Sequence, residues 1–542
     1  MSAKKIFQDE NLWLWLLAGA TLAIVCLVRL RLLGVALERD EGEYAYMGQQ
    51  LLKGVLPYTE SYSMKFPGIY IVYAIILAIF GHSHTGIHFA LALANLASAF
   101  LLFQIGRRLF NKTVGVSAGA SFAVITLSPA VQGLWANAEH FVVLFALAGI
   151  LLTLSALEKD NKPQLFLAGL ALGFSFLIKQ HGVLFFLFVF IYVCLFYFRK
   201  DPGVLQRIIL KVTPFVVGGL TPLALTAVIY IGTNNFGAFW FWTFEYASEY
   251  VSLVPLAQGI DLFVRAFGRI LQANWLVLLL SLLGLVAVAW DKSIRKNYAF
   301  SFGFLAISFL AITPGLYFRP HYFILLTPAL ALFAGIGLSV IVDGLSSRRL
   351  KTFAALCVLS VSFAASFYQQ KEFFFAYSTL EASRYTYGLN PFPESLAIAE
   401  YINKNTDEED AVAILGSEPQ INFYARRRSA TGFLYMYPLM ENHKYARLMQ
   451  ESMIKEIESR QPKFIVFVNS GSSWGIRPSS DPLLFNWQRR YIMENYELAG
   501  LAHILSRDKT IYKWGTNAAD TYWRSIVASS GNIGMLVYKR KI

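Results

Sequence analysis

A cluster of carboxylates lies immediately beyond the first long apolar run of the sequence. Residues 39–44 read Arg-Asp-Glu-Gly-Glu-Tyr, which places Asp40, Glu41 and Glu43 within four positions. A carboxylate held at a membrane surface can take a proton from a hydroxyl as a general base, or it can bind a divalent cation. The alternative is a solvated acidic loop, or an ion pair with Arg39. The spacing alone leaves both interpretations open.

Three basic residues lie in short polar segments beside apolar runs. Lys65 begins Lys-Phe-Pro-Gly-Ile-Tyr, Lys179 lies in a tight turn at 178–182, and Arg319 lies in Tyr-Phe-Arg-Pro-His-Tyr. Fixed positive groups can stabilise an anion such as a leaving phosphate. An ionisable group at membrane depth is a functional candidate by default, although Lys179 could instead extend to the interface.

Further polar residues adjoin these segments, and for them a structural role at the end of a span is the alternative interpretation. They are Glu139, His140, His321 and Tyr322. A loose histidine set has spacing compatible with metal binding, but we interpret it as an interfacial loop of hydrogen-bonded histidines. It consists of His82, His84 and His88.

Composition indicates an integral membrane protein. Of 542 residues, 56% are hydrophobic and 15% are charged, and the mean hydropathy is +0.49, whereas soluble domains carry about 25% charged residues. The net charge of +13 does not favour nucleic-acid binding, because Lys and Arg lie in short clusters between apolar runs. The three cysteines offer neither a disulfide framework nor a zinc site. The motifs of nucleotide motors, serine hydrolases and zinc proteases are missing from the sequence.

Apolar runs long enough to cross about 30 Å of hydrocarbon recur along the chain. We expect eleven spans, the first of them retained because it is long and lacks a small-residue cleavage site. Residues 66–80 hold only about 14 apolar residues, too few to cross comfortably. The predicted spans cover about 12–30, 86–106, 113–130, 138–157, 163–179, 182–198, 211–232, 272–290, 297–314, 320–342 and 351–369.

The distribution of basic residues favours a non-spanning segment at 66–80. With that choice, 15 basic residues of the inter-span loops fall on one side and 4 on the other, and the positive-inside rule assigns the first side to the cytoplasm. The N-terminus, with Lys4 and Lys5, then lies in the cytoplasm, and the acidic cluster lies outside it. The 15 are Arg107, Arg108, Lys112, Lys159, Lys162, Arg199, Lys200, Arg207, Lys211, Lys292, Arg295, Lys296, Arg348, Arg349 and Lys351.

The sequence divides into a membrane part at 1–369, with its first extracytoplasmic loop at 31–67, and a soluble extracytoplasmic part at 370–542. In the second part no apolar run is long enough to span. Helices predicted near 393–405, 442–460 and 482–495 alternate with strands near 411–416 and 463–468 and with a strand pair around 496–514. This alternation favours an α/β domain with a largely parallel sheet.

The order of these motifs resembles the first loop of bacterial GT-C membrane glycosyltransferases. Asp40-Glu41 is followed by a Gly-x-x-Pro-Tyr turn at 54–58 and by Lys-x-Pro-Gly-x-Tyr at 65–70. The resemblance is greatest to family 39-type enzymes, related to protein O-mannosyltransferases, lipid A aminoarabinose transferases and galacturonosyltransferases of lipopolysaccharide cores. The chain has Lys-Phe-Pro where the aminoarabinose transferases have Lys-Pro-Pro, which leaves the sugar open.

The resemblance implies an inverting transfer of a hexosyl or pentosyl group from a polyprenyl-phosphate sugar to a glycan, lipid or protein hydroxyl, at the outer face of a bacterial inner membrane. In that superfamily the loop acid is the catalytic base, which implies Asp40, with Glu41 as its substitute. Basic residues hold the donor phosphate, which implies Lys65, Lys179 and Arg319. A divalent cation at the acidic loop is left open, membrane lipids are expected partners, and nucleic acid is not. Supporting roles would fall to Glu43, Glu139, His140, His321 and Tyr322.

Two other functions are compatible with parts of the pattern. A transporter or flippase would show discontinuous helices, internal repeats and charges near the bilayer midplane, whereas the charges here lie mainly at span ends. A glycan ligase or polymerase would share the transfer chemistry but use a diphosphate-linked donor.

Overall fold

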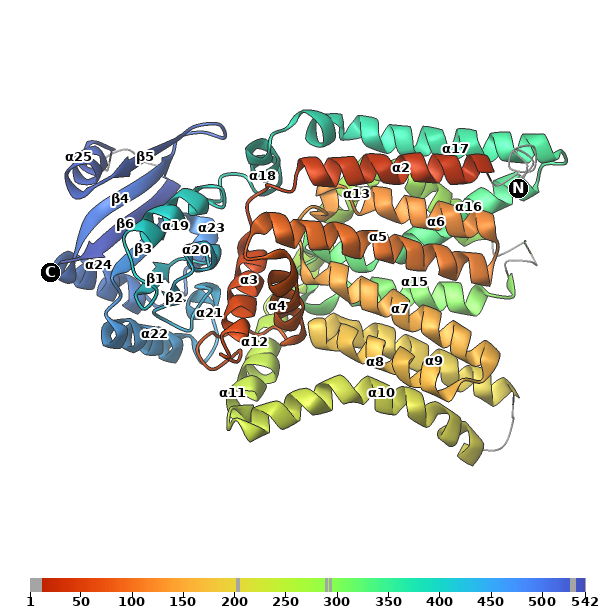
Figure 1. Cartoon of the computed structure of the whole chain (residues 1–542), viewed down its shortest axis with the longest axis horizontal. Helices are drawn as coiled ribbons and strands as arrows, with labels where there is room; N and C mark the ends of the chain where they lie inside the picture. Colours follow the sequence, from red (N-terminus) through yellow and green to blue (C-terminus); the bar gives the residue numbers. More distant parts are fainter. Residues whose placement is uncertain (1–11, 201–204, 288–290, 292–294, 527–532, 542) are drawn as a thin grey trace.

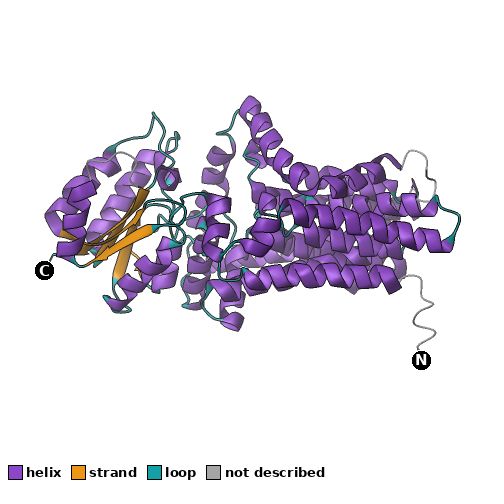
Figure 2. Ribbon diagram, turned by 90° about the horizontal axis from the view of Figure 1, so that it is seen from above, coloured by secondary structure: helices purple, strands orange, loops and turns teal. Residues whose placement is uncertain are grey.

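The computed structural model describes residues 12–200, 205–287, 291, 295–526 and 533–541. A bundle of long helices carries a sheet-bearing C-terminal part at one end (Figures 1 and 2). Within the described residues, seven helices are long and apolar enough to cross a membrane, and five shorter apolar helices accompany them. The eleven predicted spans correspond to all seven long helices and to four of the shorter ones. They are α2 (Leu12–Arg31), α5 (His84–Leu109), α6 (Lys112–Ile125), α7 (Ala138–Lys159), α8 (Lys162–Ile178), α9 (Val183–Lys200), α10 (Leu205–Gly232), α13 (Leu256–Ala287), α15 (Tyr298–Ala311), α16 (Thr327–Asp343) and α17 (Arg348–Gln369).

The remaining short apolar helix is α4 (Gly68–Phe80), the segment whose placement the sequence left open. Its 13 residues extend about 20 Å at 1.5 Å per residue, short of the roughly 30 Å of a hydrocarbon core. Figure 1 shows α4 and its neighbour α3 (Arg39–Leu52) running across the end of the bundle rather than along it. The arrangement therefore agrees with the non-spanning interpretation.

The predicted basic residues that the structure describes begin or end helices at the opposite end of the bundle from α3 and α4. Arg107 and Arg108 lie in the last turn of α5, for example, and Arg199 and Lys200 in the last turn of α9. Lys4, Lys5 and Lys292 belong to the same prediction but lie outside the described residues.

Two predicted spans are interrupted or divided in the structure, whereas the others differ from the prediction only in where they begin and end. The span expected at 272–290 belongs to α13, which begins at Leu256 and is interrupted at Asn274. The span expected at 320–342 begins as a 3-10 helix, η5 (Pro320–Leu325), and α16 follows from Thr327 with Pro328 in its first turn. Proline is tolerated there because the first turn of a helix needs no backbone N–H. The interruption leaves 319–322 at the end of the bundle that carries α3 and α4.

Glycines set the closest contacts between helices of the bundle. Gly169 of α8 lies against the backbone of α10 at Phe215, and Gly284 of α13 lies against the backbone of α16 at Phe333. A Cβ atom at either glycine would overlap the carbonyl oxygen of its neighbour. Small residues permit this close approach, which is typical of helix packing in membranes.

The C-terminal part is a six-stranded sheet with helices packed against it (Figure 2). The strand order is β2 (Arg428–Ser429), β1 (Ala411–Leu415), β3 (Phe464–Asn469), β6 (Ile533–Arg540), β4 (Tyr496–Ile504) and β5 (Thr510–Trp514). The expectation of a largely parallel sheet is wrong: β1 pairs in parallel with β2 and β3, but the β3–β6, β6–β4 and β4–β5 pairs are antiparallel. The cause is β6, a strand beyond the last one predicted, which inserts between β3 and β4.

The predicted helices and strands of this part are present with ends shifted by a few residues, and several short elements were not predicted. The elements are α18 (Thr379–Tyr387), α19 (Glu394–Lys404), β1 (Ala411–Leu415), α20 (Gln420–Ala425), β2 (Arg428–Ser429), α21 (Tyr437–Met440), α22 (Ala446–Arg460), β3 (Phe464–Asn469), α23 (Gly471–Trp474), α24 (Leu483–Asn495), β4 (Tyr496–Ile504), β5 (Thr510–Trp514), α25 (Thr516–Ile526) and β6 (Ile533–Arg540).

The C-terminal part is attached to the segment that carries the acidic cluster. Gly42 of α3 lies so close to Gln420 of α20 that a Cβ atom would clash. Just before α3, the backbone N–H of Leu37 donates a hydrogen bond to the hydroxyl of Tyr424, at 2.9 Å. The acidic cluster therefore lies between the helix bundle and the sheet.

Candidate active site

A cavity of about 810 Å³ lies where the helix bundle meets the C-terminal part. Its volume falls within the roughly 300–1,000 Å³ of small-molecule sites. One wall comes from α3 and from the ends of bundle helices, and the opposite wall comes from loops of the C-terminal part. Seven of the predicted site residues line the cavity: Asp40, Glu43, Lys65, Lys179, Arg319, His321 and Tyr322.

Asp40 lies in the first turn of α3, a helix in a segment for which the sequence predicts a loop. The helix starts with a capping box between Glu38 and Glu41, and its N-terminus favours a carboxylate in the first turn. Oδ1 of Asp40 accepts hydrogen bonds from Nζ of Lys65 at 2.9 Å and from the hydroxyl of Tyr435 at 2.6 Å. Oδ2 lies 4.0 Å from Nε2 of His321 and accepts no hydrogen bond from the described residues.

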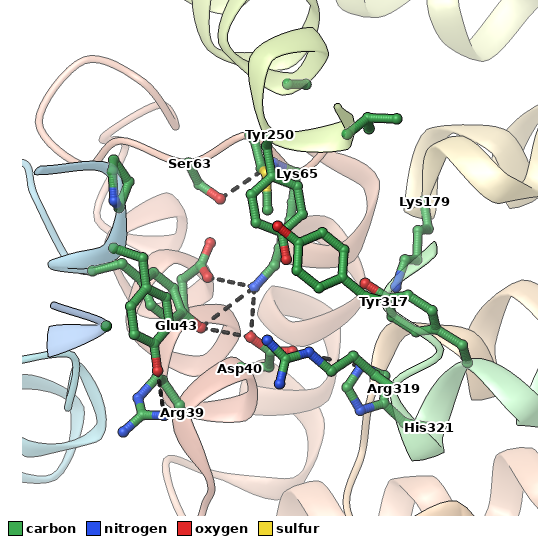
Figure 3. A pocket seen from close by; sticks show the side chains of 18 of the residues that line it. Arg39, Asp40, Glu43, Ser63, Lys65, Lys179, Tyr250, Tyr317, Arg319 and His321 are labelled. Carbon is green, nitrogen blue, oxygen red and sulfur yellow. Dashed lines mark hydrogen bonds and ion pairs between the residues drawn. The ribbon is translucent and has the colours of Figure 1, made fainter. Parts of the chain in front are cut away.

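Lys65 is shared between two carboxylates of α3 (Figure 3). Glu43, three residues after Asp40 and on the same helix face, binds Nζ of Lys65 at 2.6 Å and accepts a second hydrogen bond from Tyr70 at 2.7 Å. The ring of Tyr44 lies 4.6 Å from the ammonium. Lys65 thus carries two negative neighbours for its one positive charge.

These contacts keep both partners of the Asp40–Lys65 pair charged. Burial raises the pKa of Asp40, but Lys65, His321 and the hydrogen bond from Tyr435 outweigh burial and hold that pKa below its usual range. Burial lowers the pKa of Lys65, but Asp40 and Glu43 together raise it above its usual range. Asp40 is therefore ionised at neutral pH, as a proton acceptor must be.

A second ion pair lies on the bundle side of the cavity. Lys179, at the turn between α8 and α9, is paired with Glu139 in the first turn of α7, and its ammonium lies 4.1 Å from the ring of Tyr322. His321 connects the two pairs, because its Nε2 lies 3.9 Å from Glu139 and 4.0 Å from Asp40. Its Nδ1 lies 2.8 Å from the amide oxygen of Gln132.

Arg319 differs from both lysines because it forms no ion pair with any described residue. Its guanidinium lies 5.5 Å from the ring of Tyr317, and its side chain extends toward Asp40 (Figure 3). A guanidinium remains charged at any pH at which proteins are stable and presents a planar set of donors that suits phosphate. This residue is the cation of the cavity that is available to an anionic ligand.

Comparisons with known proteins agree on one fold. Residues 65–231 match a family described as dolichyl-phosphate-mannose-protein mannosyltransferase. ArnT from Cupriavidus metallidurans bound to undecaprenyl phosphate is similar with a TM-score of 0.56 and 13% identity, over 85% of this chain and 93% of that chain. Archaeal oligosaccharyltransferase AglB from Archaeoglobus fulgidus, in complex with an inhibitory peptide and a dolichol-phosphate, is similar with a TM-score of 0.54 and 12% identity. The match covers 94% of this chain and 75% of that chain. No curated protein sequence matches the chain.

These likenesses extend over most of the chain and include both of its parts. The chain has the GT-C glycosyltransferase fold. The resemblance drawn from the motifs is confirmed, and so is a polytopic helical protein with a C-terminal α/β part. Together with the family match, the GT-C fold supports a multi-pass membrane glycosyltransferase.

Three predicted residues do not line the GT-C cavity, and one of them, Glu139, contacts a lining residue through its ion pair with Lys179. Glu41 is fully buried and points away from Asp40, where it accepts hydrogen bonds from the backbone of Ala136 and lies 2.9 Å from Nε2 of His88. His140 is buried beside Asn95, at 3.2 Å. Glu41 therefore holds α3 against the bundle, and the structure does not bring it to the cavity as a substitute for Asp40.

The acidic loop does not present a divalent-metal site. Asp40 and Glu43 face one another across the Lys65 ammonium, which fills the position that a cation between them would need. Glu41 is turned toward His88. In the part of the chain that the structure describes, no group of three or more metal-ligating side chains converges. The residues present therefore do not fit a divalent cation.

Several residues of the cavity were not predicted from the sequence. Tyr435 and Glu441 come from the C-terminal part, more than 350 residues after Asp40 in the chain, and neither lies in a recognisable motif. Gln132, which contacts His321, follows the Ser-Pro pair at 128–129 and was the one that the sequence could have flagged. Contacts between the two parts of the chain bring Tyr435 and Glu441 to the cavity, and such long-range contacts cannot be read from the sequence.

Proposed function

We propose that this protein transfers a glycosyl group from a polyprenyl-phosphate sugar to an acceptor hydroxyl at the extracytoplasmic face of a bacterial inner membrane. The observation that carries the proposal is one cavity in which an ionised carboxylate, Asp40, faces Arg319, a cation with no ion-pair partner among the described residues. A base and an anion-binding group on either side of one space are what a hydroxyl needs to displace a phosphate. The similar structures that hold undecaprenyl phosphate and a dolichol-phosphate support a lipid phosphate as leaving group.

The reaction is a single displacement at the anomeric carbon. Oδ2 of Asp40 accepts the proton of the acceptor hydroxyl while its oxygen forms the new bond to the anomeric carbon. The bond from that carbon to the phosphate oxygen breaks, and the lipid phosphate leaves with the electron pair and with inversion of the anomeric configuration. Arg319 and Lys179, which line the same cavity, stabilise the charge that grows on the phosphate.

The proposed side of the membrane follows from charge. The basic residues cluster at the end of the bundle remote from the cavity, and the positive-inside rule assigns that end to the cytoplasm. The cavity and the C-terminal part at 370–542 then lie outside. A donor carried across the membrane on a lipid suits such a location, because nucleotide sugars are cytoplasmic.

A transporter is the less suitable function for this architecture. Alternating-access transporters bind their solutes near the bilayer midplane, between the helices of two repeats. Here the cavity lies at one end of the bundle, and 14 of its 36 lining residues come from α3 and the C-terminal part. A soluble part that forms a wall of the site suits transfer between two substrates.

Loss of label from a donor lipid tests this function. Membranes that contain the protein are incubated with lipid-linked sugars extracted from the same cells after growth on tritiated sugar. We expect the wild type to move the label from the lipid to an acceptor, and Asp40→Asn to slow this by about 10²–10⁴-fold, the usual contribution of a general base. Asp261→Asn, at an exposed ion pair of α13, is the matched control and should behave as wild type. Equal transfer by Asp40→Asn would remove Asp40 as the base.

A further inference from the structure

The C-terminal part contributes a side chain to the reacting carboxylate. Tyr435, in the loop between β2 and α21, donates its hydroxyl hydrogen to Oδ1 of Asp40 at 2.6 Å and accepts a longer hydrogen bond from Nζ of Lys65 at 3.4 Å. The centroid of its ring lies 5.0 Å from the same ammonium. Tyr435 is half-buried at the edge of the cavity, where its hydroxyl contacts both partners of the Asp40–Lys65 pair.

The two oxygens of Asp40 consequently have different surroundings. Oδ1 accepts two hydrogen bonds, from Lys65 and Tyr435, whereas Oδ2 accepts none from the described residues and faces His321 across 4.0 Å. Two donors on one oxygen restrict rotation of the carboxylate about its Cβ–Cγ bond. The oxygen that remains free to take a proton is held in a fixed direction.

The loop that carries Tyr435 is itself fixed to the helix of Asp40. The next residue, Met436, donates its backbone N–H to the hydroxyl of Ser417 at 2.9 Å, and Tyr437 accepts a hydrogen bond from Arg39 at 2.7 Å. Arg39 also donates to the carbonyl oxygen of Ser417, at 2.6 Å. Arg39, the residue directly before Asp40, thus binds Ser417 and Tyr437, which hold the segment around Tyr435 in place.

We propose that Tyr435 is a positioning residue for Asp40, so that the C-terminal part completes the site instead of only covering it. Tyr435 orients Oδ2 toward the acceptor hydroxyl through its hydrogen bond to Oδ1. Its effect on the transfer rate rests on the proposed function, whereas its effect on the carboxylate does not. The two effects can be measured separately.

The test compares Tyr435→Phe with Tyr424→Phe. Both remove one hydroxyl of the C-terminal part that binds the α3 region, but Tyr424 binds the backbone of Leu37 and not the carboxylate. In the first assay, a hydrophobic carbodiimide, which attacks protonated carboxyls, labels Asp40 across a pH series, and the Asp40 peptide is quantified by mass spectrometry. Loss of a hydrogen bond to the ionised form should raise the labelling of Asp40 in Tyr435→Phe at the acidic end of the series, so that its labelling curve begins at a higher pH than that of the wild type.

The second assay measures transfer of labelled sugar over the same pH range. We expect Tyr435→Phe to lower kcat roughly 10- to 100-fold with little change in KM for the donor, because a displaced base loses alignment rather than binding. Tyr424→Phe should leave the labelling curve in place. A Tyr435→Phe variant with wild-type labelling and wild-type kcat would overturn the proposal.

The outcomes also separate this inference from the proposed function. A shifted labelling curve with no transfer by the wild type would uphold the role of Tyr435 and reject glycosyl transfer. Transfer by the wild type with unchanged labelling in Tyr435→Phe would do the reverse. Labelling is carried out in native membranes, and thermal unfolding is recorded alongside. A variant that merely unfolds is recognised because buried carboxyls such as Glu418 are then labelled as strongly as Asp40.

Discussion

The three predicted basic residues of the cavity differ in how far nearby carboxylates balance their charge. Lys65 is balanced by Asp40 and Glu43, and Lys179 is balanced by Glu139. Arg319 has an aromatic neighbour but no carboxylate within ion-pair distance among the described residues. An arriving phosphate would therefore meet Arg319 as its first uncompensated charge, while the lysines must share theirs.

This difference predicts which substitution weakens donor binding most. Arg319→Ala should raise KM for the lipid donor by about tenfold or more, equivalent to loss of one charge-assisted hydrogen bond, and Arg319→Lys should recover part of the loss. Steady-state kinetics with the extracted donor measures both. Arg265→Ala, at an exposed ion pair with Asp261, is the control and should not change KM. Equal donor KM in Arg319→Ala and wild type would contradict this assignment.

The ion pair of Asp40 predicts a pH effect with a definite sign. Because Lys65 holds the pKa of Asp40 below its usual range, the base stays ionised until the medium is strongly acidic. Lys65→Met removes the positive charge that most strongly opposes the effect of burial on Asp40. The pKa of Asp40 should therefore rise, and the acid limb of the kcat/KM profile should move to higher pH. Lys53→Met, at the exposed C-terminus of the same helix, should leave the profile unchanged. A limb that stays in place in Lys65→Met would refute the coupling.

At the scale of elements, the helix α3 selects which acids reach the cavity. Residues three apart share a helix face, whereas the next residue points about 100° away. Asp40 and Glu43 consequently meet Lys65, and Glu41 turns toward His88 and the backbone of Ala136.

The sequence locates the acidic cluster but does not separate the role of Asp40 from that of Glu41, because the pattern of residues predicts a loop there. The capping pair Glu38 and Glu41 was the local signal for a helix, and it would have separated Asp40 from Glu41. The apolar spans were predictable because span length is a local property of the chain. The strand β6 and Tyr435 were not, because both depend on pairings between segments distant in sequence.

The contact between the segment η3 (Phe241–Tyr246) and α21 contains a pH-sensitive group. Glu441, directly after α21, accepts a hydrogen bond from Tyr246 at 3.2 Å and lies 3.7 Å from Arg477, with Arg319 also nearby. Burial, partly offset by Arg477 and Tyr246, raises the pKa of Glu441 to about 7. The folded state thus favours the protonated form more than the unfolded chain does, whose glutamates titrate near pH 4.3.

The sign of the resulting stability change follows from linkage. The contribution of Glu441 to stability is fully present below about pH 4.3 and is lost as the pH rises to about 7 and above. Glu441→Gln should therefore raise the thermal midpoint relative to wild type at pH 8 and change it little at pH 5. Thermal unfolding of the purified protein in mild detergent at both pH values measures this. A larger gain in thermal midpoint at pH 5 than at pH 8 would be inconsistent with a buried carboxyl whose pKa is raised.

At the scale of the whole molecule, the proposed function requires the cavity to lie on the extracytoplasmic side of the membrane. Single cysteines are placed at Lys53 and Asp508 on the cavity side and at Lys200 on the opposite end, all exposed positions, in a chain whose native cysteines are changed to serine. An impermeant maleimide should label the first two in intact cells and the third only after lysis. Labelling of Lys200→Cys in sealed cells would invert the proposed orientation.

The lipid that copurifies with the protein tests the central claim most directly. The wild type and Asp40→Asn are purified in mild detergent, and their bound lipids are identified by mass spectrometry. If Asp40 is the base of a sugar transfer from a lipid phosphate, the wild type should carry free polyprenyl phosphate and Asp40→Asn should carry the same lipid with its sugar still attached. Identical lipids in the two proteins, or no polyprenyl phosphate in either, would contradict the account.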